Sequence, residues 1–201
     1  MSDNTTRRKI LDTMFHLVAE KGYDKASIGQ LAERIGLQKA SIYYYFKSKE
    51  DIFLQLAQEL YGDSYRAQLV FLDGEPDVAS YEAALLEAGR QLIDSYFEHP
   101  DSRRFYAEID LQTTRIPALK ELVRLSDAEF YAFLEQCLAR GVALGAFPAT
   151  FDLRRSTQLL YTVLIGIDQA ILYDLPLDPK AVWADVIANL LASKERAYPQ
   201  L

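Results

Sequence analysis

The spacing of apolar residues predicts α-helices along the whole chain. Side chains such as Ile10, Met14 and Leu17 recur every three or four residues, which places them on one face of a helix. No stretch alternates apolar and polar residues with a period of two over a useful length, so no strand is predicted. The pattern and its capping residues predict about nine helices. They cover roughly residues 5–21, 27–35, 39–46, 48 to the low 70s, 78–98, 102–111, 116–141, 152–173 and 179–191. We therefore expect an all-α protein.

Two of these helices are short and are joined by a tight turn. Ser27 can cap the first of them, with Gln30 reaching back to it, and Gly36 is expected to end it. The second short helix should turn Ile42 and Phe46 inward and leave its other side chains available. This is the layout of a helix-turn-helix, in which the second helix enters the major groove of DNA.

The charge of the chain is unevenly distributed. The net charge is -7, yet residues 1–50 carry nine Lys or Arg against six Asp or Glu, while the remainder carries thirteen against twenty-three. Because DNA is a polyanion, a mildly basic head and an acidic body suggest that the head binds DNA and the body faces away from it. We therefore divide the chain into a DNA-binding domain, 1–50, and a helical body, 51–201.

Composition narrows the class of protein further. A chain of 201 residues, half of them apolar, can bury a substantial core and needs no disulfide bonds or structural metal ions to fold. Its single cysteine, Cys137, permits neither an internal disulfide nor a multi-cysteine zinc site, and is expected to be a buried small hydrophobe. No signal segment opens the chain and no apolar run approaches about 18 residues. We expect a cytoplasmic protein without a membrane partner.

Catalytic and metal-binding patterns find little support. His16 and His99 are too far apart in sequence to suggest metal-ligand spacing, so no metal site is predicted. There is no glycine-rich phosphate loop, nucleophile elbow or HExxH motif. Glu108 and Asp110, near Asp101, are interpreted as a solvated helix edge. We expect that the protein is not an enzyme and needs no cofactor.

An ordered series of residues through about 7–56 carries a family resemblance. It includes Gly22-Tyr23, Ser27-Ile28, Gly36-Leu37, the run Ser41-Ile42-Tyr43-Tyr44-Tyr45-Phe46, and Lys47-Ser48-Lys49-Glu50. In this order the residues resemble the TetR type of bacterial transcriptional regulators. Beyond residue 60 only the helical-bundle architecture is similar. The resemblance implies a homodimer, usually built by pairing the last two helices of each chain, with a small-molecule pocket inside each body. By this resemblance, residues 51–201 form a helical ligand-binding and dimerisation domain.

Three positions depart from the family pattern. Val18 stands where Phe is more common, Gln38 where a small hydroxyl residue often opens the recognition helix, and Tyr45 where His is common. None of these changes affects the expected fold, but they obscure the operator sequence.

The predicted DNA face lies mainly on the second short helix. Its candidates are Ser27, Gln38, Lys39, Ala40, Ser41, Tyr43, Tyr44, Tyr45 and Lys49. Lys39 is either a contact to a guanine edge or a nearby phosphate, or a solvated surface lysine; the motif favours the contact. Tyr43 and Lys49 resemble the family's phosphate contacts, which fix register without reading bases. Tyr45 is either core or a phosphate contact.

The predicted ligand pocket and dimer interface lie in the body. The pocket candidates are Tyr65, Tyr96, Phe105, Phe130, Phe133, Leu134, Cys137, Tyr161, Leu164, Ile165 and Asp168. Asp168 interrupts an apolar helix, where a charge is unfavourable unless paired or hydrated. It could meet a cationic ligand, pair with Arg90 or Arg140, or lie at the dimer interface. The interface candidates are Leu160, Val163, Ile167, Ile171, Trp183, Val186, Ile187 and Leu190.

These expectations describe a dimeric, sequence-specific transcriptional regulator. The resemblance favours a repressor released from a palindromic DNA operator by a small hydrophobic or partly cationic effector. One alternative is a dimeric DNA-binding protein without an effector, whose aromatic body is filled core. A helical-bundle enzyme or carrier with an inert head is the other.

Overall fold

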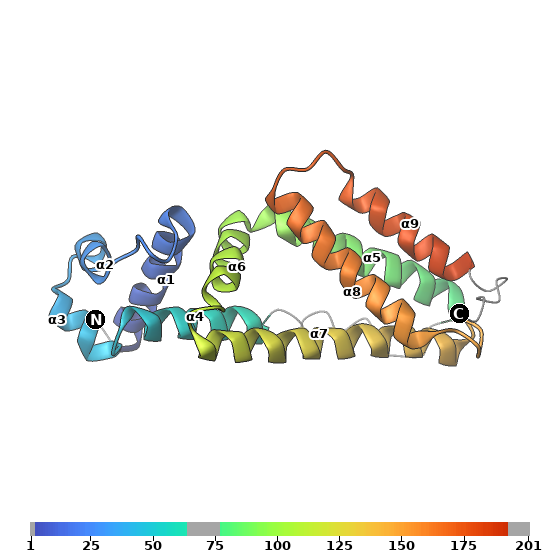
Figure 1. The fold of residues 1–201 in the computed structure, drawn as a ribbon, viewed down its shortest axis with the longest axis horizontal. Helices are drawn as coiled ribbons and strands as arrows, with labels where there is room; N and C mark the ends of the chain where they lie inside the picture. The colour runs from blue at the N-terminus through green and yellow to red at the C-terminus, as the bar shows by residue number, and fades with distance from the viewer. Residues whose placement is uncertain (1–2, 64–76, 193–201) are drawn as a thin grey trace. The chain divides into compact units, whose positions relative to one another are not determined.

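The computed structural model describes residues 3–63 and 77–192, and these form α-helices joined by short turns, without a strand (Figure 1). The helices are α1 (Asp3–Lys21), α2 (Ile28–Ile35), α3 (Lys39–Tyr45), α4 (Lys49–Asp63), α5 (Val78–Glu98), α6 (Pro100–Gln112), α7 (Pro117–Leu144), α8 (Leu153–Leu172) and α9 (Pro179–Ala192). The prediction of an all-α fold is confirmed.

Helix boundaries differ from the prediction mainly at starts. Helix α1 begins at Asp3, two residues before the predicted start near residue 5. Helix α6 begins at Pro100 rather than near residue 102, because proline suits the first position of a helix. The predicted end of the fourth helix and the loop expected near residue 74 lie outside the described residues.

The chain packs as two compact units. The first comprises residues 1–64 and 99–126, and the second residues 65–98 and 127–201. Residues 51–64 and 99–126 therefore pack with the head rather than with the rest of the body. These borders differ from the functional division proposed at residue 50, which stays a prediction.

In the first unit, α1 packs against α2, α4 and α6. Its apolar stripe is fully covered: Ile10 and Leu17 have no exposed surface. The ring of Phe105 on α6 lies 5.1 Å from that of Phe15 on α1 and 5.0 Å from that of Phe53 on α4. These stacked and tilted rings join three helices into one core.

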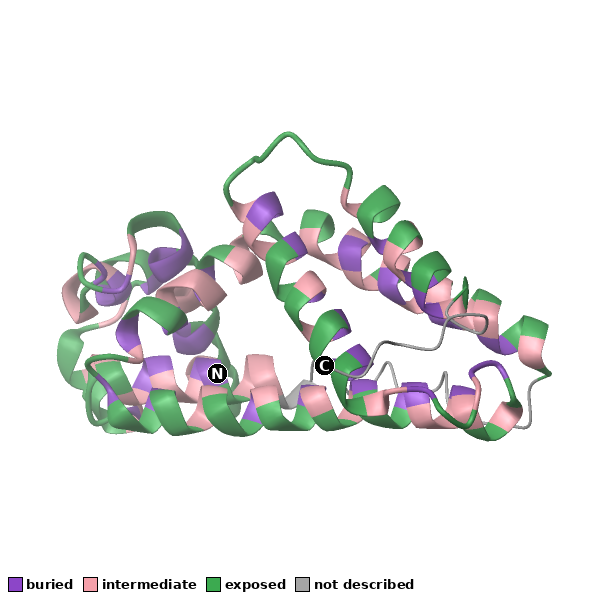
Figure 2. Ribbon diagram, turned by 45° about the vertical axis from the view of Figure 1, so that its right-hand side comes forward, coloured by how far each residue is buried: buried purple, intermediate pink, exposed green. Residues whose placement is uncertain are grey.

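In the second unit, α5 packs against α8 and α9. The indole N–H of Trp183 on α9 donates a hydrogen bond of 2.9 Å to the carbonyl oxygen of Leu86 on α5. The hydroxyl of Tyr81 donates one of 2.8 Å to the carbonyl oxygen of Cys137, and Cys137 itself is buried, as predicted. Buried residues line one side of the helices and exposed residues the other (Figure 2).

Within residues 3–63 and 77–192, none of the helices combines the length and apolarity that crossing a bilayer requires.

Candidate nucleic-acid interface

The two short helices form as their sequence predicts. The Ser27 hydroxyl accepts a hydrogen bond from the Gln30 amide N–H (3.2 Å), and the Gln30 side-chain oxygen accepts one from the Ser27 amide N–H (3.1 Å). This capping box starts α2. Gly36 ends the helix with φ 71°, a left-handed conformation that glycine adopts without strain. The predicted helix-turn-helix is thus present.

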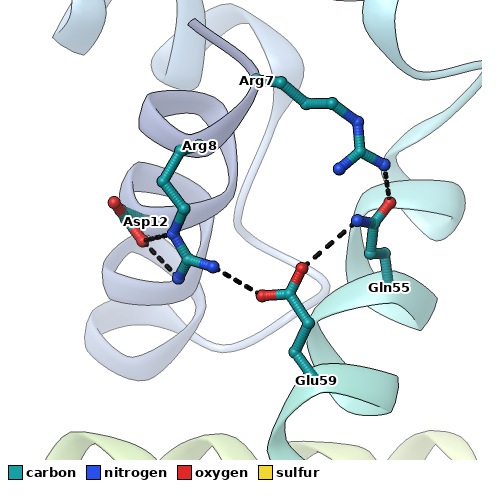
Figure 3. Close-up of polar contacts among 5 residues, drawn as sticks. All are labelled: Arg7, Arg8, Asp12, Gln55 and Glu59. Carbon is teal, nitrogen blue, oxygen red and sulfur yellow. Dashed lines mark hydrogen bonds and ion pairs between the residues drawn. The ribbon is translucent and has the colours of Figure 1, made fainter. Parts of the chain in front are cut away.

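Helix α3 is anchored by its two predicted inward residues. Ile42 is fully buried and Phe46 nearly so. The guanidinium of Arg7 on α1 lies 4.9 Å from the centroid of the Phe46 ring and also donates to the side-chain oxygen of Gln55 on α4 (Figure 3). Arg7 therefore connects the end of the recognition helix to α1 and α4.

The opposite side of α3 is open. Gln38 precedes the helix without making a side-chain capping bond, and Gln38, Lys39 and Ala40 are exposed. Tyr43 and Tyr44 expose 53% and 76% of their surface, large fractions for aromatic side chains. Ser41 is half-buried. The structure thus brings polar and aromatic predicted DNA contacts together on one face.

Lys39 lies across the start of α2. A Cβ added at Gly29 would be 3.1 Å from Cε and 3.4 Å from Nζ of Lys39. Since this is tighter than ordinary van der Waals contact, the missing side chain at Gly29 gives the lysine its path. The sequence pattern did not indicate this relation.

Tyr45 is half-buried and packs against the core of the first unit. A hydrogen bond with the Asp3 carboxylate raises the pKa of Tyr45, and partial burial adds to this shift. Its ring meets that of Tyr44 edge to face, at 5.0 Å between centroids. Of the two roles considered for Tyr45, packing against α1 is the one these contacts support.

Several cationic side chains of the head form ion pairs within the first unit. Arg8 pairs with Asp12 (2.6 Å) and with Glu59 (2.7 Å), as Figure 3 shows. Arg34 pairs with Glu20 at 2.6 Å. By contrast, the described residues provide no hydrogen bond or ion pair for the side-chain ammonium groups of Lys21, Lys25, Lys39 and Lys47. These four ammonium groups, more than the guanidinium groups of Arg8 and Arg34, are available to a polyanion.

Lys49 is also engaged. Its ammonium donates to the carbonyl oxygens of Tyr23 (2.8 Å) and Ala26 (3.2 Å), and it lies 4.0 Å from the centroid of the Tyr23 ring. Partial burial lowers the pKa of Lys49, and nearby Asp24 partly offsets this. The residue proposed from the family pattern as a phosphate contact is thus held by backbone groups of its own unit.

Glu108 is a residue that sequence reasoning misjudged. Its carboxylate accepts a hydrogen bond of 2.8 Å from the amide N–H of Tyr23. The interpretation of Glu108 as part of a solvated helix edge is therefore wrong. The two residues are 85 positions apart, so no local signal could have found the contact.

Comparison with known proteins identifies the family. A family model described as bacterial regulatory proteins of the tetR family matches residues 10–56. An HTH-type transcriptional repressor of Mycobacterium tuberculosis is 31% identical over an alignment of 137 residues, with coverage of 60% of this chain and 70% of that one. The chain belongs to the TetR family of bacterial regulatory proteins. It is a DNA-binding transcriptional regulator, as the helix-turn-helix predicts.

Solved structures share the TetR-family fold over nearly the whole chain. The regulator FadR from Bacillus subtilis, solved with stearoyl-CoA, has a TM-score of 0.65 at 19% identity and covers 94% of this chain and 99% of that one. A protein from Saccharomonospora viridis, described as a transcriptional regulator in complex with choline, has a TM-score of 0.72 at 20% identity, with coverage of 96% and 97%. At these identities the likeness establishes the fold.

The predicted pocket residues of this TetR-family chain do not all lie together. Phe105 belongs to the core of the first unit, while Phe130, Leu134 and Leu164 are buried in the core of the second. Ile165 is 43% exposed. The other candidates of the second unit are buried Cys137 and half-buried Tyr96, Phe133, Tyr161 and Asp168. Tyr65 lies outside the described residues.

Most predicted interface residues are covered within one chain. The buried ones are Leu160, Ile167, Ile171, Trp183, Ile187 and Leu190, and the half-buried ones are Val163 and Val186. The six buried side chains pack in the core of the second unit and are not available to a second copy. The apolar width of α8 and α9 arose because each helix contacts two other helices of its own unit.

Proposed function

We propose that this TetR-family regulator is a dimeric repressor, which binds a palindromic operator through α3 and leaves it when a small molecule binds in the second unit. The observation that carries the proposal is the open face of α3, with Lys39, Tyr43 and Tyr44 exposed on a helix that Ile42 anchors. An action on chromosomal DNA implies a cytoplasmic protein.

The exposed residues fall into two groups: those whose side chains suit contacts to base edges, and those that suit contacts to the phosphates of the DNA backbone. Lys39 suits the acceptor edge of guanine, Gln38 can bond adenine in two places, and Ala40 suits a thymine methyl group. Ser41 and Tyr44 are further candidates for base contacts. Tyr43 through its hydroxyl, and Ser27 at the start of α2, suit phosphates, which fix the register of the protein on DNA.

The dimer would use apolar side chains that one chain leaves exposed. Leu159 and Ile165 on α8 expose 47% and 43% of their surface, and Val182 on α9 exposes 37%. Covering these side chains with the same face of a second copy would remove apolar surface from water. A twofold dimer would present two α3 helices to half-sites about 34 Å apart, one turn of DNA.

The effector is proposed to be small and hydrophobic or partly cationic. Among proteins of similar fold, one was solved with stearoyl-CoA, whose acyl chain is hydrophobic, and one with choline, a small cation. In this chain, Phe133 and Tyr161 are half-buried aromatic side chains of the second unit, and Asp168 is a half-buried carboxylate. Effector and operator would oppose each other through a coupling free energy of about 1–3 kcal/mol.

A regulator without an effector is a second candidate. It is favoured by the packing of Phe130, Leu134 and Leu164 in one apolar cluster, since a filled core leaves a ligand no space. Both candidates bind DNA, and they differ only in the response to small molecules.

Selection from random duplex DNA tests the proposal. We expect enrichment of a palindrome whose half-sites are centred about one helical turn apart. Repeating the binding assay against a small-molecule library should then yield compounds that release the selected duplex. Failure to enrich any sequence would refute operator recognition, whereas enrichment without a releasing compound would favour the regulator without an effector.

A further inference from the structure

The turn between α1 and α2, residues 22–26, is held by two charged side chains from distant helices. Glu108 comes from α6 and Lys49 from the first position of α4. All of these residues belong to the first unit. Both side chains bind Tyr23, but they bind different groups of its backbone.

Glu108 holds the amide side of Tyr23. Its Oε2 accepts the Tyr23 N–H at 2.8 Å, and its Oε1 would lie 3.1 Å from a Cβ added at Gly22. Gly22 has φ 82°, a left-handed conformation that glycine adopts without strain. The absence of a Cβ at Gly22 also allows the Glu108 carboxylate to approach the backbone closely. A hydrogen bond to a charged acceptor is stronger than one between neutral groups.

Lys49 holds the carbonyl side. Its ammonium donates to the carbonyl oxygens of Tyr23 and Ala26 and lies over the Tyr23 ring. That ring is almost fully buried and lies 4.5 Å from the ring of Phe53 on α4. The two side chains are thus complementary: Lys49 donates hydrogen bonds to backbone carbonyl oxygens of the turn, and Glu108 accepts one from a backbone amide of the turn.

The turn leads directly into the recognition unit. Ser27, the cap of α2, follows Ala26, and α2 in turn packs against α3. A displacement of residues 22–26 would therefore shift α2 and the DNA face of α3 with it. Correct placement to within a fraction of an ångström is what hydrogen bonds to bases require.

We propose that Lys49 and Glu108 are a pair of positioning residues for DNA recognition, which clamp the Tyr23 backbone and so fix the placement of α2 and α3. Lys49 acts through the turn and not on a phosphate, and Glu108 belongs to the DNA-binding machinery although it lies outside the helix-turn-helix. The inference rests on the proposed recognition of DNA by α3.

The test compares Glu108→Ala, Glu108→Gln and Lys49→Met in the full chain at a temperature where each is folded, using fluorescence anisotropy on the selected operator. Loss of Glu108 or Lys49 lowers the fraction of molecules in which residues 22–26 hold the position that DNA binding requires. We therefore expect the affinity for the operator to fall by up to about tenfold. Glu108→Gln keeps an acceptor for the Tyr23 N–H and should stay within about threefold of wild type.

A matched control is available on the same turn. Arg115 forms an ion pair with Asp24 at 2.9 Å, but both side chains are about two-thirds exposed. Exposed pairs contribute little, so Arg115→Ala should change operator affinity by less than about twofold. Exchange of the Tyr23 amide hydrogen, measured without DNA, should accelerate in Glu108→Ala and not in the control.

Two results would overturn the inference. One is wild-type operator affinity in both Glu108→Ala and Lys49→Met. The other concerns the slope of the logarithm of the binding constant against the logarithm of the salt concentration. If Lys49→Met reduces this slope by about one per protomer while the stability of the protein is unchanged, Lys49 contacts a phosphate. A wild-type protein that binds no duplex would instead refute the proposed function, and unaltered Tyr23 exchange in Glu108→Ala would refute the clamp alone.

Discussion

Replacing Gly89 with alanine should destabilise the second unit, although alanine favours helices. Gly89 lies inside α5, and an added Cβ would be 2.0 Å from Cε2 and 2.3 Å from Nε1 of Trp183. Carbon atoms pack at about 3.5–4.0 Å, so the tryptophan or its helix α9 must move. Trp183 is 2% exposed and donates its indole hydrogen to the carbonyl oxygen of Leu86. Movement of Trp183 or α9 would therefore also lengthen or break the hydrogen bond from the Trp183 indole to Leu86.

The magnitude follows from three contributions. Forcing an extra carbon into a packed core costs about 1–3 kcal/mol. Leaving a buried donor or acceptor unsatisfied costs about 1–3 kcal/mol more. Alanine in place of glycine inside a helix returns about 0.5–1 kcal/mol. We expect a net loss of about 3 kcal/mol, which lowers the melting temperature of a chain of this size by roughly 6–12 °C.

Equilibrium unfolding in urea, followed by circular dichroism, measures this loss. The matched control is Gly166→Ala in α8, where an added Cβ meets nothing within 4 Å and should stabilise by about 0.5–1 kcal/mol. Because the proposed dimer covers part of α8, each variant is measured at several protein concentrations. A Gly89→Ala protein as stable as wild type would refute the reasoning, since the close approach of Trp183 would then carry no energetic consequence.

Four further substitutions test the DNA face and one half-buried acid, Asp127. Lys39→Ala should cost about 1–3 kcal/mol at the selected operator, whereas Tyr43→Phe should weaken all duplexes alike; equal losses for both on specific and random DNA would contradict this division. Gly29→Ala should displace the Lys39 side chain and weaken operator binding by about 0.5–1 kcal/mol, and the effect should vanish in a Lys39→Ala background. Burial raises the pKa of Asp127, partly offset by a hydrogen bond from Tyr161. The charged form therefore opposes folding, and stability falls as the pH rises through the raised pKa. Asp127→Asn should stabilise the protein at pH 7 and not in acid where the carboxyl is protonated in both states, a difference that urea titrations at the two pH values would detect.

Local structure was open to prediction because its determinants lie close together in the sequence. The capping box of Ser27 and Gln30 joins residues three positions apart, and Gly36 ends the same helix by its own conformational freedom. The burial of Ile42 and Phe46 follows from their spacing on a short helix. For these reasons the all-α fold and the helix-turn-helix could be derived before any packing was known.

Burial in the body was harder to interpret. The apolar width of α8 and α9 suggested contact with a second chain, yet Trp183 and Leu160 are covered by helices of the same unit. Periodicity shows that a side chain avoids water but not which surface covers it. Likewise, aromatic content suggested one pocket, whereas Phe105 packs in a different unit from Phe130.

The sequence by itself determined the helices, their caps and the basic head that together specify a DNA-binding regulator, since each depends on neighbours within a few residues or on summed charge. Only the tertiary structure decided which charges remain available. It directs Lys49 at the carbonyl oxygen of Tyr23 and Glu108 at the amide of the same residue. Such contacts join positions 26 and 85 residues apart, and no local pattern encodes them because their geometry exists only once α4 and α6 have packed against the turn.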